Sequence, residues 1–417
     1  MESFNAKLTQ ATALDTREVL GVIAVVVDKE GKTLRIQTSD IANNIWKLGT
    51  VLYHGASGHQ SLDPDARTID HNSTFALGSA GKFITHIAAL QCVEQGLVTL
   101  DEPVYPHLQE LESLKVLSRN TGPDSESQPF LLQPATKKIT LRHLLSHSNG
   151  IDYEYNPMVT EWRKSKGDEP KPDFHPTREY KSPESKLDTE VITTPLLFEP
   201  GEGWLYGASI EWTQCLVVRL TNQPFTKYVN ENIFNPLGMT SSTYTPQNDV
   251  EIASRILKMV RRDGDRLLTV NYPLKELLSS VPDLSKLFVD LISQSSRLLK
   301  KEHVDLLFTP QFALESPARR YIHQDTENYA APAGIPPTMK EAPVNHSLVA
   351  LVVEEELPLS GMPKGTVTWN GMPNLIWAMH KEKGLAMIFA TQVLPVDDEK
   401  TIGLAMAFFK EAWSTFG

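Results

Sequence analysis

The chain has 417 residues, which exceeds one ordinary hydrophobic core and predicts either two lobes or two domains. Apolar residues make up 41% of it and charged residues 22%, close to the averages of soluble globular proteins, so intrinsic disorder and fibrous classes are excluded. The formal net charge of −11 opposes a nucleic-acid partner, because phosphate binding depends on clustered Lys and Arg side chains.

Cysteine usage and hydropathy indicate a cytoplasmic protein without a membrane partner. Cys92 and Cys215 lie in apolar stretches, which is typical of buried thiols rather than of a disulfide framework. The chain begins without the basic and apolar stretches of a secretory signal, and the apolar run at residues 19–27 is much shorter than the roughly 20 residues that span a bilayer. We therefore expect a cytoplasmic location.

The first part of the chain predicts two strands and a helix. Residues 19–28 are rich in β-branched side chains and end at a turn signal, which predicts a buried strand, and a second strand is expected at residues 51–54. Apolar residues then recur at helical spacing between Phe83 and Val93, and Gly96 supplies a stop. Ser79 is therefore expected at the N-terminus of this helix.

The middle of the chain alternates loops and helices. Residues 118–137 are rich in Ser, Pro, Gln and Gly, and residues 165–195 mix Lys, Glu, Asp and Pro without periodicity, so both are predicted to be loops. Residues 140–147 predict a short helix with Thr140 as its cap, and residues 210–220 predict a longer one.

The last third predicts a helical scaffold followed by a small sheet. Two amphipathic helices are expected within residues 282–309. Three short β-rich runs at residues 365–369, 374–379 and 385–390 are separated by turn signals, which predicts an antiparallel meander. A final helix at residues 402–413 is expected to pack on that sheet.

The main catalytic signal is Ser79 followed three places later by Lys82. A serine hydroxyl is a weak nucleophile until a nearby base takes its proton, and a spacing of three on a helix places both side chains on one face. A helix N-terminus adds free N–H groups and a positive field, which favour a developing oxyanion. No other Ser in the sequence is followed by Lys at this spacing. A helix cap beside a solvated lysine is the alternative.

Two phenols are candidates for proton transfer. Tyr206 follows the Gly- and Pro-rich turn at residues 199–203, and it could pass a proton between nucleophile and leaving group if a neighbouring ammonium stabilised its phenolate. Tyr153, just after Asn149-Gly150, offers a second phenol. A packed aromatic ring whose hydroxyl meets backbone or water is the alternative for both.

A candidate oxyanion hole involves residues 369–374, which end one expected strand and lead into the next. A backbone N–H on such a strand edge, paired with that of Ser79, would bind the oxyanion of a tetrahedral intermediate. An ordinary hairpin turn is the alternative.

His143 and His147 raise the possibility of a zinc site, because they are four residues apart on the expected short helix. The stretch lacks the Glu of the metalloprotease helix and no third ligand lies nearby in sequence, so capping and core hydrogen bonds are favoured, and we expect no metal ion. The chain also has no Gly-x-Ser-x-Gly motif, which opposes an α/β-hydrolase.

Five ordered blocks of the chain resemble the serine β-lactamase and penicillin-binding-protein superfamily, and within it the class C-type esterases and fungal acyltransferases. The blocks are residues 75–82 (FALGSAGK), 90–102 (LQCVEQGLVTLDE), 139–150 (ITLRHLLSHSNG), 199–207 (EPGEGWLYG) and 236–239 (PLGM). Residues 204–212 and 372–377 are most similar to the fungal acyltransferases that esterify the lovastatin side chain.

The resemblance implies an α+β fold of the β-lactamase/transpeptidase-like kind. An antiparallel sheet flanked by helices would face a mostly helical second lobe, with the active site between them. A single domain would span residues 1–417, with the α/β lobe at about 1–78 and 310–417 and the helical lobe at about 79–309.

The resemblance also assigns roles to single residues. Ser79 would carry the acyl group and lend one oxyanion N–H, Lys82 and Tyr206 would form the proton-transfer pair, and Met372 would donate the second N–H. The residues expected to bind substrate are Tyr153, Trp369 and Gly371.

Departures from the family pattern bear on the function. Tyr206 is followed by Gly-Ala208 where class C-type relatives have Asn, and residues 369–371 read Trp-Asn-Gly where relatives carry a cation, so a β-lactam specialist is not expected. The glycine-rich stretch before residues 277–280 is absent, which would remove part of one active-site wall and impair catalysis. Residues 33–48 resemble an insertion between two strands.

Together these features predict a serine acyltransferase or esterase of secondary metabolism, which forms an acyl-Ser79 intermediate and passes the acyl group to an alcohol or to water. The substrate would be a small-molecule ester or acyl thioester, free or bound to a carrier protein, and the chemistry needs no cofactor. The alternative is a catalytically impaired β-lactamase-like protein that binds a small molecule or a partner.

Overall fold

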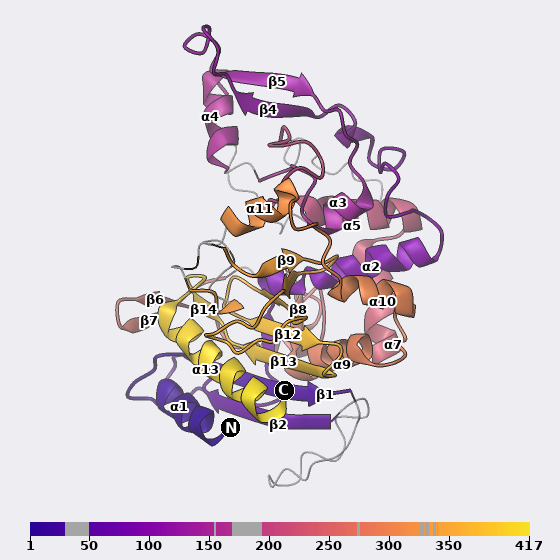
Figure 1. Ribbon diagram of the computed structural model, residues 1–417. Coiled ribbons are helices and arrows are strands. Elements are labelled where there is room, and N and C mark those ends of the chain that lie inside the picture. The colour runs from indigo at the N-terminus through magenta and orange to yellow at the C-terminus, as the bar shows by residue number, and fades with distance from the viewer. Residues whose placement is uncertain are drawn as a thin grey trace.

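A seven-stranded sheet forms the centre of the protein (Figure 1). The computed structural model describes residues 1–29, 50–153, 156–168, 194–272, 276–324, 329, 333–336, 339 and 341–417. All neighbouring strands of the sheet are antiparallel. In spatial order they are β2 (Thr50–Gly58), β1 (Gly21–Asp28), β13 (Leu385–Ala390), β12 (Ile376–His380), β11 (Val367–Asn370), β10 (Leu351–Val353) and β9 (Val344–His346).

Both ends of the chain contribute to this sheet, as expected. The strand expected at residues 19–28 is β1, which is buried except at its last residue and pairs with β13 through contacts such as Ile23 opposite Ala390. The three C-terminal runs form the meander β11–β12–β13. The strand expected at residues 51–54 is confirmed as the longer β2.

The two faces of the sheet are covered by different helices. Trp377 pairs with Ile388, one residue away from Phe389, and successive side chains of a strand point to opposite faces, so Trp377 and Phe389 face opposite ways. Phe389 lies against Phe408 of α13 (Glu399–Phe416), beside which α1 (Glu2–Thr12) packs. Trp377 lies against α9 (Val281–Ile292) and α2 (Phe83–Glu94).

Helices dominate beyond the second face. α2 packs along α5 (Ser209–Thr221), and Gln214 donates a hydrogen bond to Thr85 across this contact at 3.1 Å. Shorter helices surround the pair: α3 (Leu141–Leu145), α6 (Phe225–Val229), the π-helical turn η4 (Asn230–Phe234), α7 (Asn235–Leu237) and α10 (Lys301–Phe308). The helices expected within residues 210–220, 282–309 and 402–413 are confirmed.

In the middle of the chain one expectation is wrong and another is correct except for the end of a helix. The loop expected at residues 118–137 contains part of a hairpin of β4 (Lys115–Arg119) and β5 (Phe130–Pro134), in which each strand has one fully buried residue and hydrophobic alternation is therefore lacking. The helix expected at residues 140–147 is confirmed with Thr140 as its cap, but it ends at Leu145, because His147 has a left-handed φ of 56°.

The remaining described elements are small. The hairpin and α4 (Pro157–Ser165) lie at the end of the molecule opposite α1 and β2 (Figure 1). The others are β3 (Thr74–Ala76) paired with β8 (Leu278–Ser280), β14 (Val393–Leu394) beside β6 (Val260–Asp263) and β7 (Arg266–Thr269), and the helices η2 (Gln109–Leu111), α8 (Val250–Ser254) and α11 (Pro317–Gln324).

The fold class is confirmed: an antiparallel sheet is flanked by helices, with a helical layer beyond it. The expected limits of the two lobes stay a prediction. The expected insertion at residues 33–48 and most of the segment at 165–195 lie outside the described residues. Cys92 and Cys215 are buried free thiols, as expected. No helix in the described ranges is both long and apolar enough to cross a membrane.

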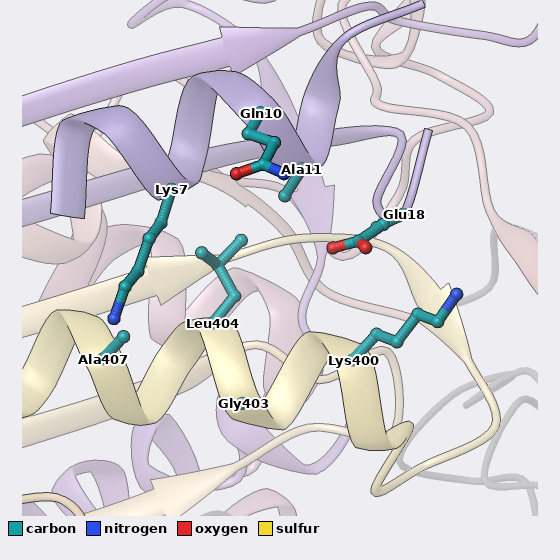
Figure 2. A pocket seen from close by; sticks show the side chains of 8 residues that line it. All are labelled: Lys7, Gln10, Ala11, Glu18, Lys400, Gly403, Leu404 and Ala407. Carbon is teal, nitrogen blue, oxygen red and sulfur yellow. The ribbon is translucent and has the colours of Figure 1, made fainter. Parts of the chain in front are cut away.

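A surface pocket lies between α1 and α13 (Figure 2). Both helices cover the face of the sheet opposite Trp377, so this pocket is remote from the Ser79 turn and contains none of the expected site residues. Its lining residues are Lys7, Gln10, Ala11, Glu18, Lys400, Gly403, Leu404 and Ala407.

Candidate active site

Ser79 lies in a single 3-10 turn, η1 (Gly78–Gly81), which leads directly into α2. The turn closes through the Ala80 amide donating to the Leu77 carbonyl and the Lys82 amide donating to the Ser79 carbonyl, both at 3.1 Å. Gly78 has a left-handed φ of 53°, which only glycine adopts without strain. The expected place of Ser79 at a helix N-terminus is confirmed.

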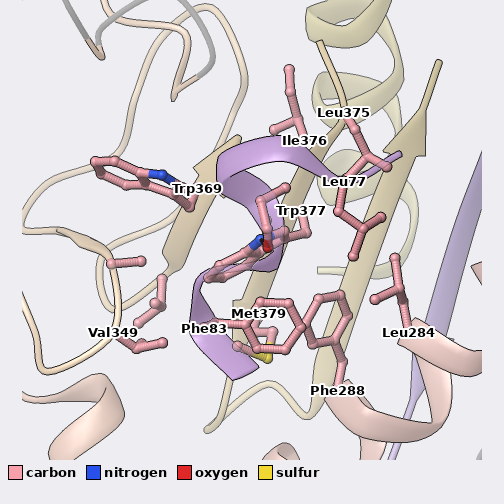
Figure 3. Close-up of a cluster of buried hydrophobic side chains, with 14 of the residues drawn as sticks. Leu77, Phe83, Leu284, Phe288, Val349, Trp369, Leu375, Ile376, Trp377 and Met379 are labelled. Carbon is pink, nitrogen blue, oxygen red and sulfur yellow. Dashed lines mark hydrogen bonds between the residues drawn. The ribbon is translucent and has the colours of Figure 1, made fainter. Parts of the chain in front are cut away.

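An aromatic cluster holds this turn against the sheet (Figure 3). Trp377 of β12 is almost fully buried and donates its ring N–H to the Ala80 carbonyl at 3.1 Å. Its ring lies 5.5 Å from that of Phe83 and 5.4 Å from that of Phe288, measured between centroids. The Ser79 turn, α9 and the sheet therefore share one apolar contact.

The edge that follows β11 touches the turn. A Cβ atom on Gly371 would lie 2.0 Å from the Leu77 carbonyl oxygen, and one on Gly78 would lie 3.2 Å from the Met372 nitrogen. Only glycine at position 371 permits this approach. Among the described residues, neither the Ser79 amide nor the Met372 amide has a hydrogen-bond acceptor. The Met372 amide therefore lies next to the turn that carries Ser79, and both amides are available as donors.

Two neighbouring loops carry the phenols. The amide of Leu205 donates to the His147 carbonyl at 2.9 Å, which holds the loop at 199–207 beside residues 147–153. A Cβ on Gly207 would lie 2.2 Å from the Ile151 carbonyl oxygen, so the two backbones meet where no side chain fits. Tyr206 and Tyr153 are thereby brought to the same place.

Lys82 joins both phenols. Its ammonium donates a hydrogen bond to the Tyr153 hydroxyl at 3.0 Å and lies 4.5 Å from the centre of the Tyr206 ring. The Tyr206 hydroxyl is buried and has no hydrogen-bond partner among the described residues. The Ser79 hydroxyl likewise makes no hydrogen bond to a described residue, so direct bonds from Ser79 to Lys82 or Tyr206 are not formed in this structure.

Glu211 of α5 is a functional candidate that the sequence did not reveal. Its carboxylate accepts a hydrogen bond from the Tyr153 hydroxyl at 3.0 Å and lies 3.7 Å from the Lys82 nitrogen. Burial lowers the pKa of Lys82, but the negative charge of Glu211, together with the contributions of Tyr153 and Tyr206, outweighs burial and holds the pKa well above its ordinary value. Burial, reinforced by the Glu211 charge, raises the pKa of Tyr153 well above its ordinary value.

The ring of Trp369, on β11, packs against the ring of Tyr206, with centroids 5.0 Å apart. Three buried histidines continue this cluster: the ring of His147 lies 4.8 Å from Tyr206 and 5.4 Å from His346, and His86 lies next to His147 at 6.4 Å. Burial lowers the pKa of all three, to about 3 for His86 and about 4 for His346, so they are neutral near pH 7.

The histidines considered as zinc ligands are placed apart. His143 completes a capping box with Thr140 at the start of α3, whereas His147 lies beyond the helix in the aromatic cluster. No group of His, Cys, Asp and Glu side chains suited to a metal ion occurs in the described ranges.

The structure brings most of the expected site residues together, and it gives Tyr153 a contact that was not expected, with Glu211. Lys82, Tyr206 and Trp369 meet, and Gly371 and Met372 touch the Ser79 turn. Tyr153, expected to bind substrate, links Lys82 to Glu211, and its contact with substrate stays a prediction. A Glu within the apolar stretch at 208–218 was the one available signal for Glu211, because a buried acid requires a partner.

The fold and the Ser-x-x-Lys turn define the β-lactamase/transpeptidase-like class of proteins. The profile of the Beta-lactamase family matches residues 36–407 of the chain. A relative named "Acyltransferase calJ" from Penicillium decumbens is 30% identical, and the match covers 100% of this chain and 99% of that protein. The chain belongs to the Beta-lactamase family.

Other similar proteins support the same branch. "Lovastatin esterase" from Penicillium rubens is 28% identical, with 96% of each chain covered. The solved structure of "Simvastatin Synthase (LovD)" from Aspergillus terreus, unliganded, has a TM-score of 0.81 at 24% identity and covers 100% of this chain and 98% of that one. The chain is thus an enzyme of the acyltransferase and esterase branch of this family.

Proposed function

We propose that the enzyme transfers an acyl group through a covalent intermediate on Ser79. The proposal is supported by three features together: the turn that carries Ser79 at the start of α2, the Met372 amide next to that turn, and the contact of Lys82 with the Tyr206 ring. A nucleophile, an oxyanion site and a proton-transfer group are the parts that acyl transfer needs.

In the first half-reaction the Ser79 oxygen attacks the carbonyl carbon of an ester or thioester. Tyr206 accepts the Ser79 proton, with the Lys82 ammonium 4.5 Å from its ring stabilising the phenolate. The oxyanion is bound by the amides of Ser79 and Met372. Collapse of the tetrahedral intermediate expels the alcohol or thiol, which receives the proton from Tyr206, and leaves acyl-Ser79.

In the second half-reaction Tyr206 takes the proton of an alcohol, or of water, as its oxygen attacks the acyl carbon of acyl-Ser79. The acyl–Ser79 bond then breaks, and the Ser79 oxygen receives the proton back from Tyr206. The balance between transfer and hydrolysis depends on how well an acceptor alcohol excludes water from the site. The likeness to a methylbutanoyltransferase, mlcH of Penicillium citrinum, favours an apolar acyl chain and an alcohol acceptor of secondary metabolism.

The acyl donor is proposed to arrive either free or on a carrier protein. Ser79, Lys82 and Met372 are all partly exposed, so a donor attached to a large carrier can reach the nucleophile. Comparing acylation by a free N-acetylcysteamine thioester and by the same acyl group on a carrier protein distinguishes the two. A cytoplasmic location is proposed as well, since the two cysteines are free thiols.

Intact-mass spectrometry tests the proposal. The protein is incubated with a panel of acyl thioesters and esters, with and without alcohols. We expect one added acyl group per chain, which an alcohol discharges faster than buffer alone. A chain that acquires no adduct from any donor, although folded, would contradict the proposal.

A further inference from the structure

Glu211 is a buried acidic residue, and a buried charge requires a compensating partner. It lies on α5, whose residues from Ser209 to Val218 are buried apart from Gln214, and its own side chain is 8% exposed. A buried carboxylate is unfavourable unless a cation or hydrogen-bond donors compensate it. Oε1 has such partners, whereas Oε2 has none among the described residues.

The compensation comes from a short chain of contacts that ends at the catalytic pair. Lys82 donates to the Tyr153 hydroxyl, and that hydroxyl donates to Glu211 Oε1, each at 3.0 Å. The same carboxylate oxygen lies 3.7 Å from the Lys82 nitrogen. The Lys82 ammonium is thus held by Tyr153 and by Glu211. It also lies 4.5 Å from the centre of the Tyr206 ring.

The other titratable groups near Lys82 do not supply this charge. His86 on α2, His147 after α3 and His346 on β9 are buried, and burial lowers the pKa of each, so they carry no charge near pH 7. Within the part of the chain that the structure describes, Glu211 is the carboxylate that forms an ion pair with Lys82.

We propose that Glu211 is a positioning residue which, with Tyr153, keeps Lys82 as an ammonium ion aimed at Tyr206, so that Tyr206 rather than Lys82 takes the Ser79 proton. An ammonium has no lone pair with which to accept a proton, whereas it stabilises an adjacent phenolate. This inference rests on the proposed role of Ser79, and it adds a residue to that site.

The test compares Glu211→Gln, which removes the charge, with Glu211→Asp, which retains it. Glu161→Gln is the matched control, because Glu161 pairs with Arg119 on the surface, remote from Lys82. The rate of Ser79 phosphonylation by a fluorophosphonate is measured from pH 5 to 10. The rate rises with pH as the proton acceptor of the site loses its own proton. Without the negative charge of Glu211 that proton is lost more readily, so Glu211→Gln should shift the rising, acidic limb of the pH–rate profile to lower pH by about one unit.

Glu211→Asp and Glu161→Gln should leave the position of that limb unchanged. A Glu211→Gln profile that coincides with the wild-type profile in position, even at lower rates, would overturn the proposal, since a merely structural residue lowers rates without moving the limb.

A titration of Lys82 separates this inference from the proposed function. In protein labelled with 13C at lysine Cε, the Lys82 signal is assigned with Lys82→Arg. We expect it to remain charged above the ordinary lysine value of about 10.4 in the wild type and to titrate lower in Glu211→Gln. A wild-type signal that titrates below that value overturns the inference, even if Glu211→Gln does not fold. Absence of phosphonylation in the wild type would instead refute the role of Ser79.

Discussion

The sheet side and the helical side of the active site are held together by different forces. On the sheet side, Trp377, Phe83 and Phe288 are almost fully buried, and burying one such phenylalanine contributes about 1.5–3 kcal/mol. On the helical side, buried Glu211 and partly exposed Lys82 form an ion pair, whose net stabilisation is small because both ions lose hydration.

The difference separates two tasks. The apolar side places the Ser79 turn against the strand edge, where a shift of a fraction of an ångström matters to an oxyanion site. The polar side sets which groups are charged. Substitutions on the sheet side should therefore change rate and stability together, whereas those on the helical side should change the pH dependence.

The largest effect is expected at the point where the two sides meet. Ser79→Ala removes the nucleophile and should lower acyl transfer by about 10⁴-fold or more, because no covalent intermediate can form. Steady-state transfer from a thioester to an alcohol measures it. Ser127→Ala, an exposed serine remote from the site, should be unaffected. Retained transfer in Ser79→Ala would show that another group carries the acyl chain.

Tyr206→Phe tests the helical side. Its hydroxyl has no described hydrogen-bond partner, so the loss should lower acylation by roughly 10²–10⁴-fold without destabilising the fold. Single-turnover acylation and thermal unfolding give the two readouts. Tyr53→Phe removes a hydroxyl that bonds Asn5 on the far side of the molecule and should leave acylation unchanged. Equal rates in the two variants would exclude Tyr206 as the proton acceptor.

Gly371→Ala tests the sheet side. The added Cβ would lie 2.0 Å from the Leu77 carbonyl oxygen, so the strand edge must move and carry the Met372 amide with it. Acylation should fall by roughly 10²–10³-fold, the cost of one oxyanion donor, with a lower melting temperature.

The matched control is Gly403→Ala in α13, where a Cβ meets nothing within 4 Å. It should retain full acylation and gain about 0.5–1 kcal/mol of stability, because alanine favours a helix interior over glycine. Wild-type acylation in Gly371→Ala would mean that the strand edge does not form the oxyanion site.

A smaller effect concerns the buried histidines. The pKa of His86 is lowered to about 3, so below about pH 6.5 the unfolded chain binds a proton that the folded one does not. Each such histidine should remove about 1.4 kcal/mol of unfolding free energy per pH unit as the pH falls from 6.5 toward the folded value. Urea unfolding of wild type and His86→Gln from pH 7 to 4 measures it. Equal slopes in the two proteins would contradict this account.

Sequence reasoning succeeded where the signal was periodic. α13 buries one stripe of apolar residues, whereas α2, α9 and the strands β11–β13 are apolar and buried nearly all round; both patterns are local properties of the sequence. The β4–β5 hairpin was not predicted because each of its strands buries only one side chain fully, so no alternating pattern marks it. The predicted end of the helix at 140–147 was too late because nothing in the sequence marks the left-handed His147.

The site was accessible to sequence reasoning only in part. Ser79 and Lys82 share one helical turn, so their spacing predicts their proximity. Glu211 and Tyr153 act on Lys82 from other elements, 129 and 71 positions away in the sequence, and no local pattern encodes such contacts. Glycine is required at position 371 by another tertiary contact, the close approach of its backbone to the carbonyl of Leu77.

The most direct test of the central claim is to locate the acyl group. The protein is acylated with a thioester, quenched in acid and digested, and the modified residue is identified by tandem mass spectrometry. We expect an ester on Ser79 that is absent from Ser79→Ala. An acyl group on another residue, such as Cys92 or a surface lysine, with Ser79 unmodified, would contradict it.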